Sequence, residues 1–269
     1  MNYCLPSTSE LIKKYGLNAK KSLGQNFILD KNFTDKIARS AGNLLDSTVI
    51  EIGPGPGSLT RSILDAGVKK LIVVEKDERC LELLKEFQEF YGNRIEIVNG
   101  DALTFELPNH PSKIIANLPY NIGTTLLFKW LKNTSQIESL HLMLQKEVVQ
   151  RIVAKPGENH YGRLAVMVNF LCKTRMVFEV GSKVFTPPPK VTSAIVEIIP
   201  REKPLEDVDF SKLEKVVAAA FNQRRKMLKS SLKAIFQNPE EILNEVGIRP
   251  DLRPEELTIE EFCRLVKKI

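Results

Sequence analysis

The segment EIGPGPG, residues 51–57, has the residue types of a ligand-binding turn. Its glycines alternate with prolines, follow an apolar run and precede SLTRSILDAG, which has a helical pattern. Glycines such as Gly53 and Gly55 let backbone amides approach a ligand closely and let the helix pack against the strand. Ser58 stands where a dinucleotide fingerprint has its third glycine, so the GxGxG spacing does not favour a nicotinamide cofactor. A tight turn without a ligand is the alternative.

Two carboxylates follow the next two apolar runs. Glu75 ends the second run, where a carboxylate can accept hydrogen bonds from both hydroxyls of a ribose. Asp101, in the segment NGDA, ends the third run and can accept a hydrogen bond from the exocyclic amine of adenine. Since strand ends line the ligand crevice of open α/β sheets, these groups indicate a ligand with ribose and adenine but no pyrophosphate. S-adenosylmethionine is such a ligand. A solvated carboxylate is the alternative for either residue alone.

The segment NLPY, residues 117–120, ends a fourth apolar run and resembles the Asn/Asp-Pro-Pro-Tyr signature of methyltransferases that act on exocyclic amines. The Asn117 side-chain oxygen and the Leu118 carbonyl would accept the two amine hydrogens and stabilise the positive charge that develops during methylation. Pro119 would bias Leu118 toward an extended conformation. Tyr120 would stack on the adenine face. A strand-terminating turn with a half-buried tyrosine is the alternative.

The elements that must position these segments follow from hydrophobic patterning. Apolar, β-branched runs alternate with amphipathic segments of helical length, which predicts a mostly parallel sheet with helices on both faces. The expected strands are residues 48–53, 70–77, 94–101, 113–120 and 139–147. Two later runs, 176–180 and 193–200, are separated by a proline-rich loop and predict a terminal antiparallel hairpin. The expected fold class is α/β and Rossmann-like. The GxGxG motif resembles that of the class I S-adenosylmethionine-dependent methyltransferases, which have this fold.

A change of composition near residue 204 predicts two domains. Residues 201–210 are polar, and from Ser211 onward the pattern is helical to the end of the chain. We therefore expect a Rossmann-like domain over residues 1–204 and a small all-helical domain over residues 205–269.

Composition excludes several other classes of protein. The four cysteines show no CxxC spacing and the three histidines do not cluster, so neither a metal site nor a disulfide framework is expected. The chain starts without a signal-peptide pattern and has no run of eighteen apolar residues, which predicts a soluble, cytoplasmic protein with no membrane partner. A formal net charge of +6 only weakly favours a polyanionic partner.

A family resemblance covers nearly the whole chain. Its motifs occur in the order of the small-subunit ribosomal RNA adenine dimethyltransferases, and the set NLPYNI, FTPPPKV and FNQRRK is highly specific to that family and its erythromycin-resistance relatives. The motifs are KSLGQNF (21–27), EIGPGPGSLT (51–60), VE (74–75), GDA (100–102), NLPYNI (117–122), LQKEV (144–148), YGRL (161–164), VFTPPPKVTSAIV (184–196) and AFNQRRKML (220–228).

The resemblance implies roles for individual residues. The cofactor contacts carried over from the family are Asn26, Ile28, Gly53, Gly55, Glu75, Asp101 and Asn117. Ile28 stands where the family usually has leucine. Phe185 would stack on the target adenine opposite Tyr120. The implied RNA contacts are Lys20, Lys21, Lys190, Arg224, Arg225, Lys226 and Lys229, and FNQRRKMLKSSLK is interpreted as one basic helical face over phosphates. A solvated face is the alternative for each of these charges.

The resemblance also implies the reaction and the partner. Enzymes of this family transfer two methyl groups to each of two adjacent adenines in a hairpin near the 3′ end of 16S ribosomal RNA. The expected partner is the small ribosomal subunit, held with help from the helical domain, and the expected enzyme is a metal-free monomer that acts in ribosome biogenesis. Three alternatives stay open: a large-subunit methyltransferase of the resistance type, a DNA adenine methyltransferase, and an assembly factor for which methylation is secondary.

Overall fold

The computed structural model describes residues 4–20, 25–223 and 226–269. Three expected RNA contacts, Lys21, Arg224 and Arg225, lie outside the described residues. The chain divides into two compact units, each described by itself below. The first comprises Met1–Val149 and Arg175–Pro200, and the second comprises Gln150–Thr174 and Arg201–Ile269. The second division at Arg201 is close to the boundary expected near residue 204, whereas the grouping of residues 150–174 with the C-terminal part was not expected from the sequence.

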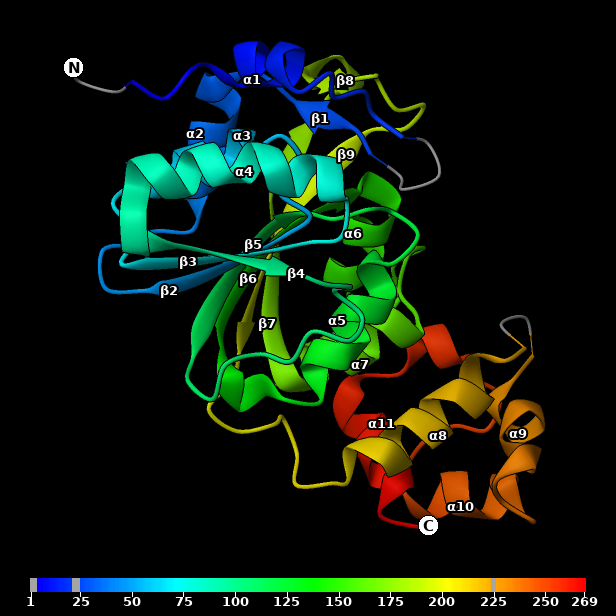
Figure 1. The fold of residues 1–269 in the computed structure, drawn as a ribbon. Helices are drawn as coiled ribbons and strands as arrows, with labels where there is room; N and C mark the ends of the chain where they lie inside the picture. Colours follow the sequence, from blue (N-terminus) through cyan, green and yellow to red (C-terminus); the bar gives the residue numbers. More distant parts are fainter. Residues whose placement is uncertain (1–3, 21–24, 224–225) are drawn as a thin grey trace. The chain divides into compact units, whose positions relative to one another are not determined.

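Within the described residues, seven strands form one sheet in the order β4-β3-β2-β5-β6-β9-β7 (Figure 1). The strands are β2 (Thr48–Ile52), β3 (Lys70–Glu75), β4 (Ile95–Asn99), β5 (Ser112–Asn117), β6 (Ile137–Gln145), β7 (Cys172–Val180) and β9 (Ser193–Pro200). The pairs β2–β3, β3–β4, β2–β5 and β5–β6 are parallel, and β9 is antiparallel to β6. The expected mostly parallel sheet with antiparallel pairing at its end is confirmed.

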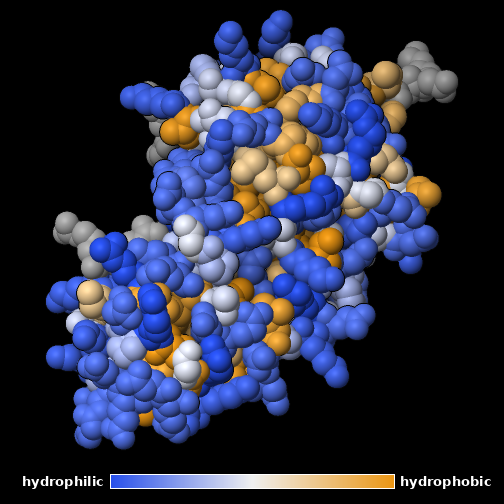
Figure 2. Space-filling view, turned by 180° about the vertical axis from the view of Figure 1, so that it is seen from behind, coloured by the Kyte–Doolittle hydropathy of each residue, from blue (hydrophilic) through white to orange (hydrophobic). Residues whose placement is uncertain are grey.

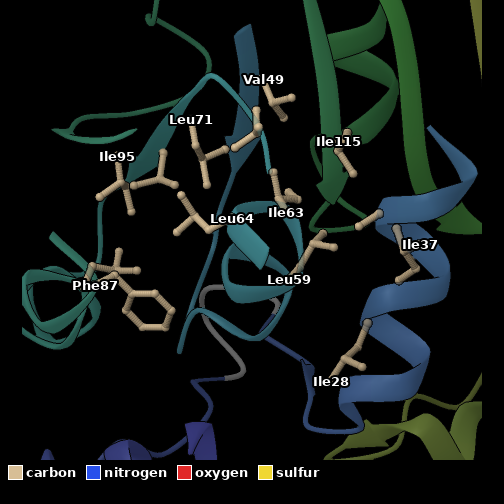
Figure 3. Close-up of a cluster of buried hydrophobic side chains, with 14 of the residues drawn as sticks. Ile28, Ile37, Val49, Leu59, Ile63, Leu64, Leu71, Phe87, Ile95 and Ile115 are labelled. Carbon is tan, nitrogen blue, oxygen red and sulfur yellow. The ribbon is translucent and has the colours of Figure 1, made fainter. Parts of the chain in front are cut away.

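Helices on both faces explain why these strands are nearly continuous apolar runs. Helices α2 (Lys31–Ser40), α3 (Ser58–Asp65) and α4 (Glu78–Tyr91) lie on one face and α5 (Gly123–Leu131) on the other (Figure 1). Ile37 of α2, Ile63 of α3 and Phe87 of α4 are at most 1% exposed and belong to one buried cluster with Val49 and Leu71 of the sheet (Figure 3). This cluster packs the helices that follow the glycine turn against the sheet.

A two-stranded ribbon joins distant parts of the first unit. Strand β1 (Phe27–Ile28), which follows α1 (Thr8–Lys14), pairs antiparallel with β8 (Phe185–Thr186). Phe27 is opposite Thr186 and Ile28 is opposite Phe185. The ribbon therefore places the family motif QNF beside the motif FTPPP.

The second unit is helical apart from the start of β7. Its helices are α7 (Arg163–Leu171), α8 (Phe210–Phe221), α9 (Leu228–Ser231), α10 (Pro239–Glu245) and α11 (Ile259–Val266), and α6 (Lys146–Val153) runs into it from the first unit. The ring of Phe221 lies 5.8 Å from that of Phe262 and 6.3 Å from that of Tyr161, measured between centroids. These aromatic contacts add to a core that is otherwise mostly aliphatic.

The expectation of one basic helix over residues 221–233 is wrong. Helix α8 ends at Phe221, and α9 begins only at Leu228. The Gln223 carbonyl accepts a hydrogen bond from the Lys226 amide at 2.8 Å, and Met227 is extended, with φ −65° and ψ 152°. An extended residue cannot continue a helix, so α8 and α9 are separate helices, with Lys226 before α9 and Lys229 inside it.

The surface is predominantly hydrophilic, as Figure 2 shows for one face. None of the helices in the described ranges is long and apolar enough to cross a membrane. Across those same ranges, no three His, Cys, Asp or Glu side chains gather where they could hold a metal ion.

Candidate active site

The glycine turn forms the floor of a cavity at the carboxyl ends of β2, β3 and β5. Gly53, Gly55 and Gly57 all have positive φ, from 55° to 81°, which a glycine adopts without steric cost. A Cβ on Gly57 would lie 2.6 Å from the Phe87 ring, and one on Gly55 would lie 3.3 Å from the Phe27 ring. The turn therefore needs glycine both for its backbone conformation and for close packing.

The cavity brings together most of the expected site residues. Its lining includes Asn26, Ile28, Gly53, Gly55, Glu75, Asp101, Asn117, Leu118, Pro119 and Tyr120. Parallel strands put their carboxyl ends on one edge of the sheet, which is why the ends of β2 (Ile52) and β5 (Asn117), 65 residues apart (117 − 52), meet here.

Glu75 is tied to the glycine turn by its carboxylate. One oxygen accepts the Gly55 amide at 3.1 Å, and the other accepts the amides of Lys76 and Asp77 at 2.8 and 2.9 Å. The side chain is buried, and this burial raises the pKa of Glu75 above its usual value, while the three backbone donors oppose the shift. Glu75 thus fixes the turn and still presents acceptor oxygens to the cavity.

Asp101 is a more exposed acceptor at the same edge. Its Oδ1 accepts the Leu103 amide at 2.9 Å, and its Oδ2 lies 3.4 Å from Lys76 Nζ. The Leu103 hydrogen bond, helped by Lys76, lowers the pKa of Asp101. Asp101 is therefore ionised at neutral pH and can only accept hydrogen bonds.

The NLPY segment is held by contacts that the sequence did not reveal. Asn117 Nδ2 donates to the Asn26 carbonyl at 3.2 Å, so Oδ1 is the atom of this amide that can accept a hydrogen bond in the cavity. The Tyr120 hydroxyl lies 2.6 Å from the hydroxyl oxygen of Ser193, which is fully buried at the start of β9. Ser193 was visible in the sequence only as part of the motif VFTPPPKVTSAIV.

Phe185 is not brought to the cavity wall. Its side chain is 3% exposed and belongs to the buried cluster, while its backbone pairs with Ile28. The stacking role expected for Phe185 stays a prediction, and it requires part of the ring to be uncovered when a base enters.

The described members of the expected RNA-binding set fall in both units. Lys20 and Lys190 are exposed in the first, Lys226 is exposed in the second, and Lys229 is half-buried there. Their role in binding RNA stays a prediction.

Glu51 is a cavity residue to which the sequence assigned no role. It is 2% exposed, and its carboxyl accepts a hydrogen bond from the Thr60 hydroxyl at 2.7 Å. Burial, reinforced by the nearby charge of Glu75, raises the pKa of Glu51 to about 8. An acidic residue inside the otherwise apolar run TVIEI was the available signal.

The raised pKa of Glu51 predicts a loss of stability as pH rises from 4.5 toward about 8. The folded protein keeps a proton that the unfolded chain releases above pH 4.5, so this contribution is complete below 4.5 and is lost as pH rises toward about 8. Over this window the free energy of unfolding should fall by up to about 1.4 kcal/mol per pH unit from this group. Glu51→Gln keeps the acceptor for Thr60 and should flatten the decline, as urea unfolding from pH 4 to 9 would measure. Parallel pH profiles of variant and parent would contradict it.

Comparison with solved structures places this fold among the class I methyltransferases. A dimethyladenosine transferase from Plasmodium falciparum matches with a TM-score of 0.80 and 28% identity, over 90% of this chain and 96% of that one. The 23S rRNA methyltransferase ErmE matches with a TM-score of 0.72 and 29% identity, over 90% and 99% of the two chains. The fold and the cavity together define a methyltransferase.

Sequence comparison gives the family. Residues 16–269 match the family described as ribosomal RNA adenine dimethylase. A protein of Paramagnetospirillum magneticum named ribosomal RNA small subunit methyltransferase A is 50% identical, over 98% of this chain and 95% of that protein. One of the same name from Agrobacterium fabrum is 51% identical, over 97% and 96%. The chain belongs to the ribosomal RNA adenine dimethylase family.

Proposed function

We propose that this enzyme uses S-adenosylmethionine to dimethylate the N6 amines of two adjacent adenosines in a hairpin near the 3′ end of 16S ribosomal RNA. The observation that carries the proposal is the orientation of Asn117, whose amide nitrogen is engaged by the Asn26 carbonyl so that Oδ1 is its acceptor in the cavity. The two relatives named small subunit methyltransferase A support the choice of RNA.

The chain's own residues fit the cofactor. The absence of side chains on the turn glycines leaves their backbone within reach of a ligand. The Glu75 carboxylate has about four acceptor positions, and backbone amides occupy three of them, so one remains for a ligand. Glu75 would hold the ribose hydroxyls and Asp101 the adenine amine. When bound, the cofactor supplies a sulfonium methyl group that a nitrogen lone pair can attack.

The acceptors at the end of β5 prepare the target amine. Its lone pair is delocalised into the adenine ring, so it attacks poorly until its geometry moves toward tetrahedral. Asn117 Oδ1 and the Leu118 carbonyl would accept its two hydrogens and stabilise that geometry and the developing positive charge. A strong base is not required, because the amine becomes acidic once alkylated.

Tyr120 would align the base by stacking, an interaction worth about 1 to 3 kcal/mol. Its bond to Ser193 holds the ring in place before the base arrives, which reduces the ordering cost of binding. Phe185 is the proposed partner on the opposite face of the base.

Two lysines that follow α8, Lys226 and Lys229, should contribute phosphate affinity that is independent of sequence. Neither Lys226 nor Lys229 has an ion-pair partner among the described residues. Replacing both with glutamine should weaken RNA binding and lower the slope of log affinity against log salt by about 0.7 to 0.9 for each phosphate that is no longer neutralised. Filter binding over a range of salt concentrations measures this slope.

A matched pair tests whether position matters. Lys69→Gln/Lys203→Gln makes the same change of charge at exposed lysines outside the predicted RNA-binding set, and its slope should stay close to the parent's. An unchanged slope for Lys226→Gln/Lys229→Gln would mean that these lysines are only solvated.

One experiment tests the reaction and separates the alternatives. Purified small subunits, large-subunit RNA and single-stranded DNA of the same hairpin sequence are incubated with the enzyme and labelled S-adenosylmethionine, and modified adenosines are mapped by mass spectrometry. Dimethylation confined to two adjacent adenosines of the small-subunit RNA is expected. The likeness to ErmE makes large-subunit methylation the second candidate, and label found only there would replace the proposal. We also propose that the enzyme is cytoplasmic, binds no metal, is a monomer and acts in ribosome biogenesis.

A further inference from the structure

The segment that carries Asn26 is anchored by Gln25, which itself also lines the cavity. Gln25 Nε2 donates to Asp77 Oδ2 at 2.9 Å, and its Oε1 accepts the Lys20 amide at 2.9 Å. The Gln25 side chain is thus bonded at both polar atoms. The next three residues line the cavity, and the Asn26 carbonyl holds the Asn117 amide. A displacement of Gln25 would therefore move Asn26, and with it the Asn117 side chain that is proposed to accept a hydrogen bond from the target amine.

Asp77 connects this segment to the other side of the cavity. Its backbone amide donates to Glu75 Oε1 at 2.9 Å, and its carboxylate, in a side chain only 5% exposed, accepts Arg79 Nε at 3.0 Å and Arg79 Nη2 at 2.6 Å. Arg79 Nη1 reaches the Asn18 carbonyl at 3.1 Å. Asp77 thus joins Glu75 through its backbone amide and Gln25 and Arg79 through its carboxylate, and Arg79 extends the connection to Asn18.

Helix capping alone does not explain Asp77. As the N-cap of α4 it accepts the Arg79 amide at 3.3 Å through Oδ1, a role that asparagine or serine would fill equally well. The bond from Gln25 uses the other oxygen. Arginine pairing lowers the pKa of Asp77 to about 2, so the carboxylate is ionised throughout the physiological range.

We propose that Asp77, Gln25 and Arg79 form a latch that holds residues 25–28 against the cofactor cavity and so orients the Asn117 amide. They are positioning residues for methyl transfer, since they act through Glu75 and Asn26. The part of this inference that concerns the cofactor rests on the proposed function, whereas the latch itself can be measured without any ligand.

Exchanging the chemistry of the pair tests the latch. Gln25→Glu sets two carboxylates against each other. Asp77→Asn can keep the α4 cap through Oδ1, but it then sets an amide donor against both Gln25 Nε2 and Arg79 Nη2. The double variant Gln25→Glu/Asp77→Asn restores one donor, one acceptor and the net charge. Gln136→Glu is the matched control, because Gln136 Nε2 makes a similar bond to Asn109 Oδ1, at 3.2 Å, away from the cavity.

Two measurements test the latch: the affinity for S-adenosylmethionine and the amide hydrogen exchange of residues 25–28. Each single variant should weaken S-adenosylmethionine binding about tenfold, the scale of one lost hydrogen bond to a charged group. The double variant should bind more tightly than either single variant but less tightly than the parent, because it restores the bond between positions 25 and 77 but not the oxygen that accepts Arg79 Nη2. Amide hydrogen exchange of residues 25–28, followed without cofactor, should rise in each single variant and fall again in the double. The Gln136→Glu control should change neither.

The outcomes separate this inference from the proposed function. Parental amide exchange in both single variants overturns the latch, whatever the cofactor does. Raised exchange that the double variant does not restore also overturns it, because general damage would then explain the loss. If the parent does not bind S-adenosylmethionine, the proposed function fails, while restored protection in the double variant still supports the latch.

Discussion

Replacing Asn117 with alanine is expected to lower the rate of the first methyl transfer by about 10²- to 10³-fold, the scale seen when one preorganised polar group is removed from a transition state. Unmodified adenine presents two hydrogens, for Asn117 Oδ1 and the Leu118 carbonyl, whereas the monomethyl product presents only one. The second transfer thus has one orienting bond fewer from the start. Single-turnover reactions, with mono- and dimethyladenosine counted by mass spectrometry, measure both steps.

The variant Asn117→Asp separates the two bonds that this side chain makes. Aspartate can still accept from the target amine but cannot donate to the Asn26 carbonyl, which holds the amide at 3.2 Å. Its first transfer should fall between those of the parent and Asn117→Ala. Dimethylation by Asn117→Ala at the parental rate would refute the role given to the end of β5. The alanine variant also tests the assembly-factor alternative, since an inactive protein that still supports subunit assembly would favour it.

Removal of the Glu75 side chain is expected to weaken S-adenosylmethionine binding by about 1 to 3 kcal/mol. Glu75→Ala loses the proposed ribose acceptors and also releases the amides of Gly55, Lys76 and Asp77. Glu75→Gln should weaken binding too, because its NH₂ group must face at least one of these backbone donors. Calorimetry on folded variants measures the affinity.

Glu78→Ala provides the control for Glu75. Glu78 is an exposed glutamate three residues further along, outside the cavity lining, and its removal should leave the affinity unchanged. Equal affinities for Glu75→Ala and the parent would show that Glu75 only stabilises the turn.

Parallel-sheet geometry made much of the site predictable. Once the apolar runs were assigned as consecutive strands, Glu75, Asp101 and Asn117 had to meet at one edge, because crossover connections put every strand's carboxyl end there. The same runs predicted the sheet, because continuous runs of β-branched residues are typical of parallel strands that are buried on both faces.

Long-range pairing explains what the sequence could not reveal. The contact of Asn26 with Asn117 and the pairing of Ile28 with Phe185 join residues 91 and 157 positions apart, and no local pattern encodes such a partner. Periodicity also failed after Phe221, where the chain remains helix-like in composition but Met227 is extended. The burial of Glu51 depends on which residues cover it, which only the tertiary structure supplies.

The pairing of β1 with β8 has a consequence for the time at which this enzyme becomes competent during its own synthesis. The N-terminal wall of the cavity is made early, but its partner strand emerges only after residue 186 has been added and has left the exit tunnel. Until then residues 27 and 28 lack the backbone partners that hold them in register. A nascent chain can thus complete its glycine turn and the first strands of the sheet before residues 27 and 28 gain the β8 partners that hold this wall of the cavity.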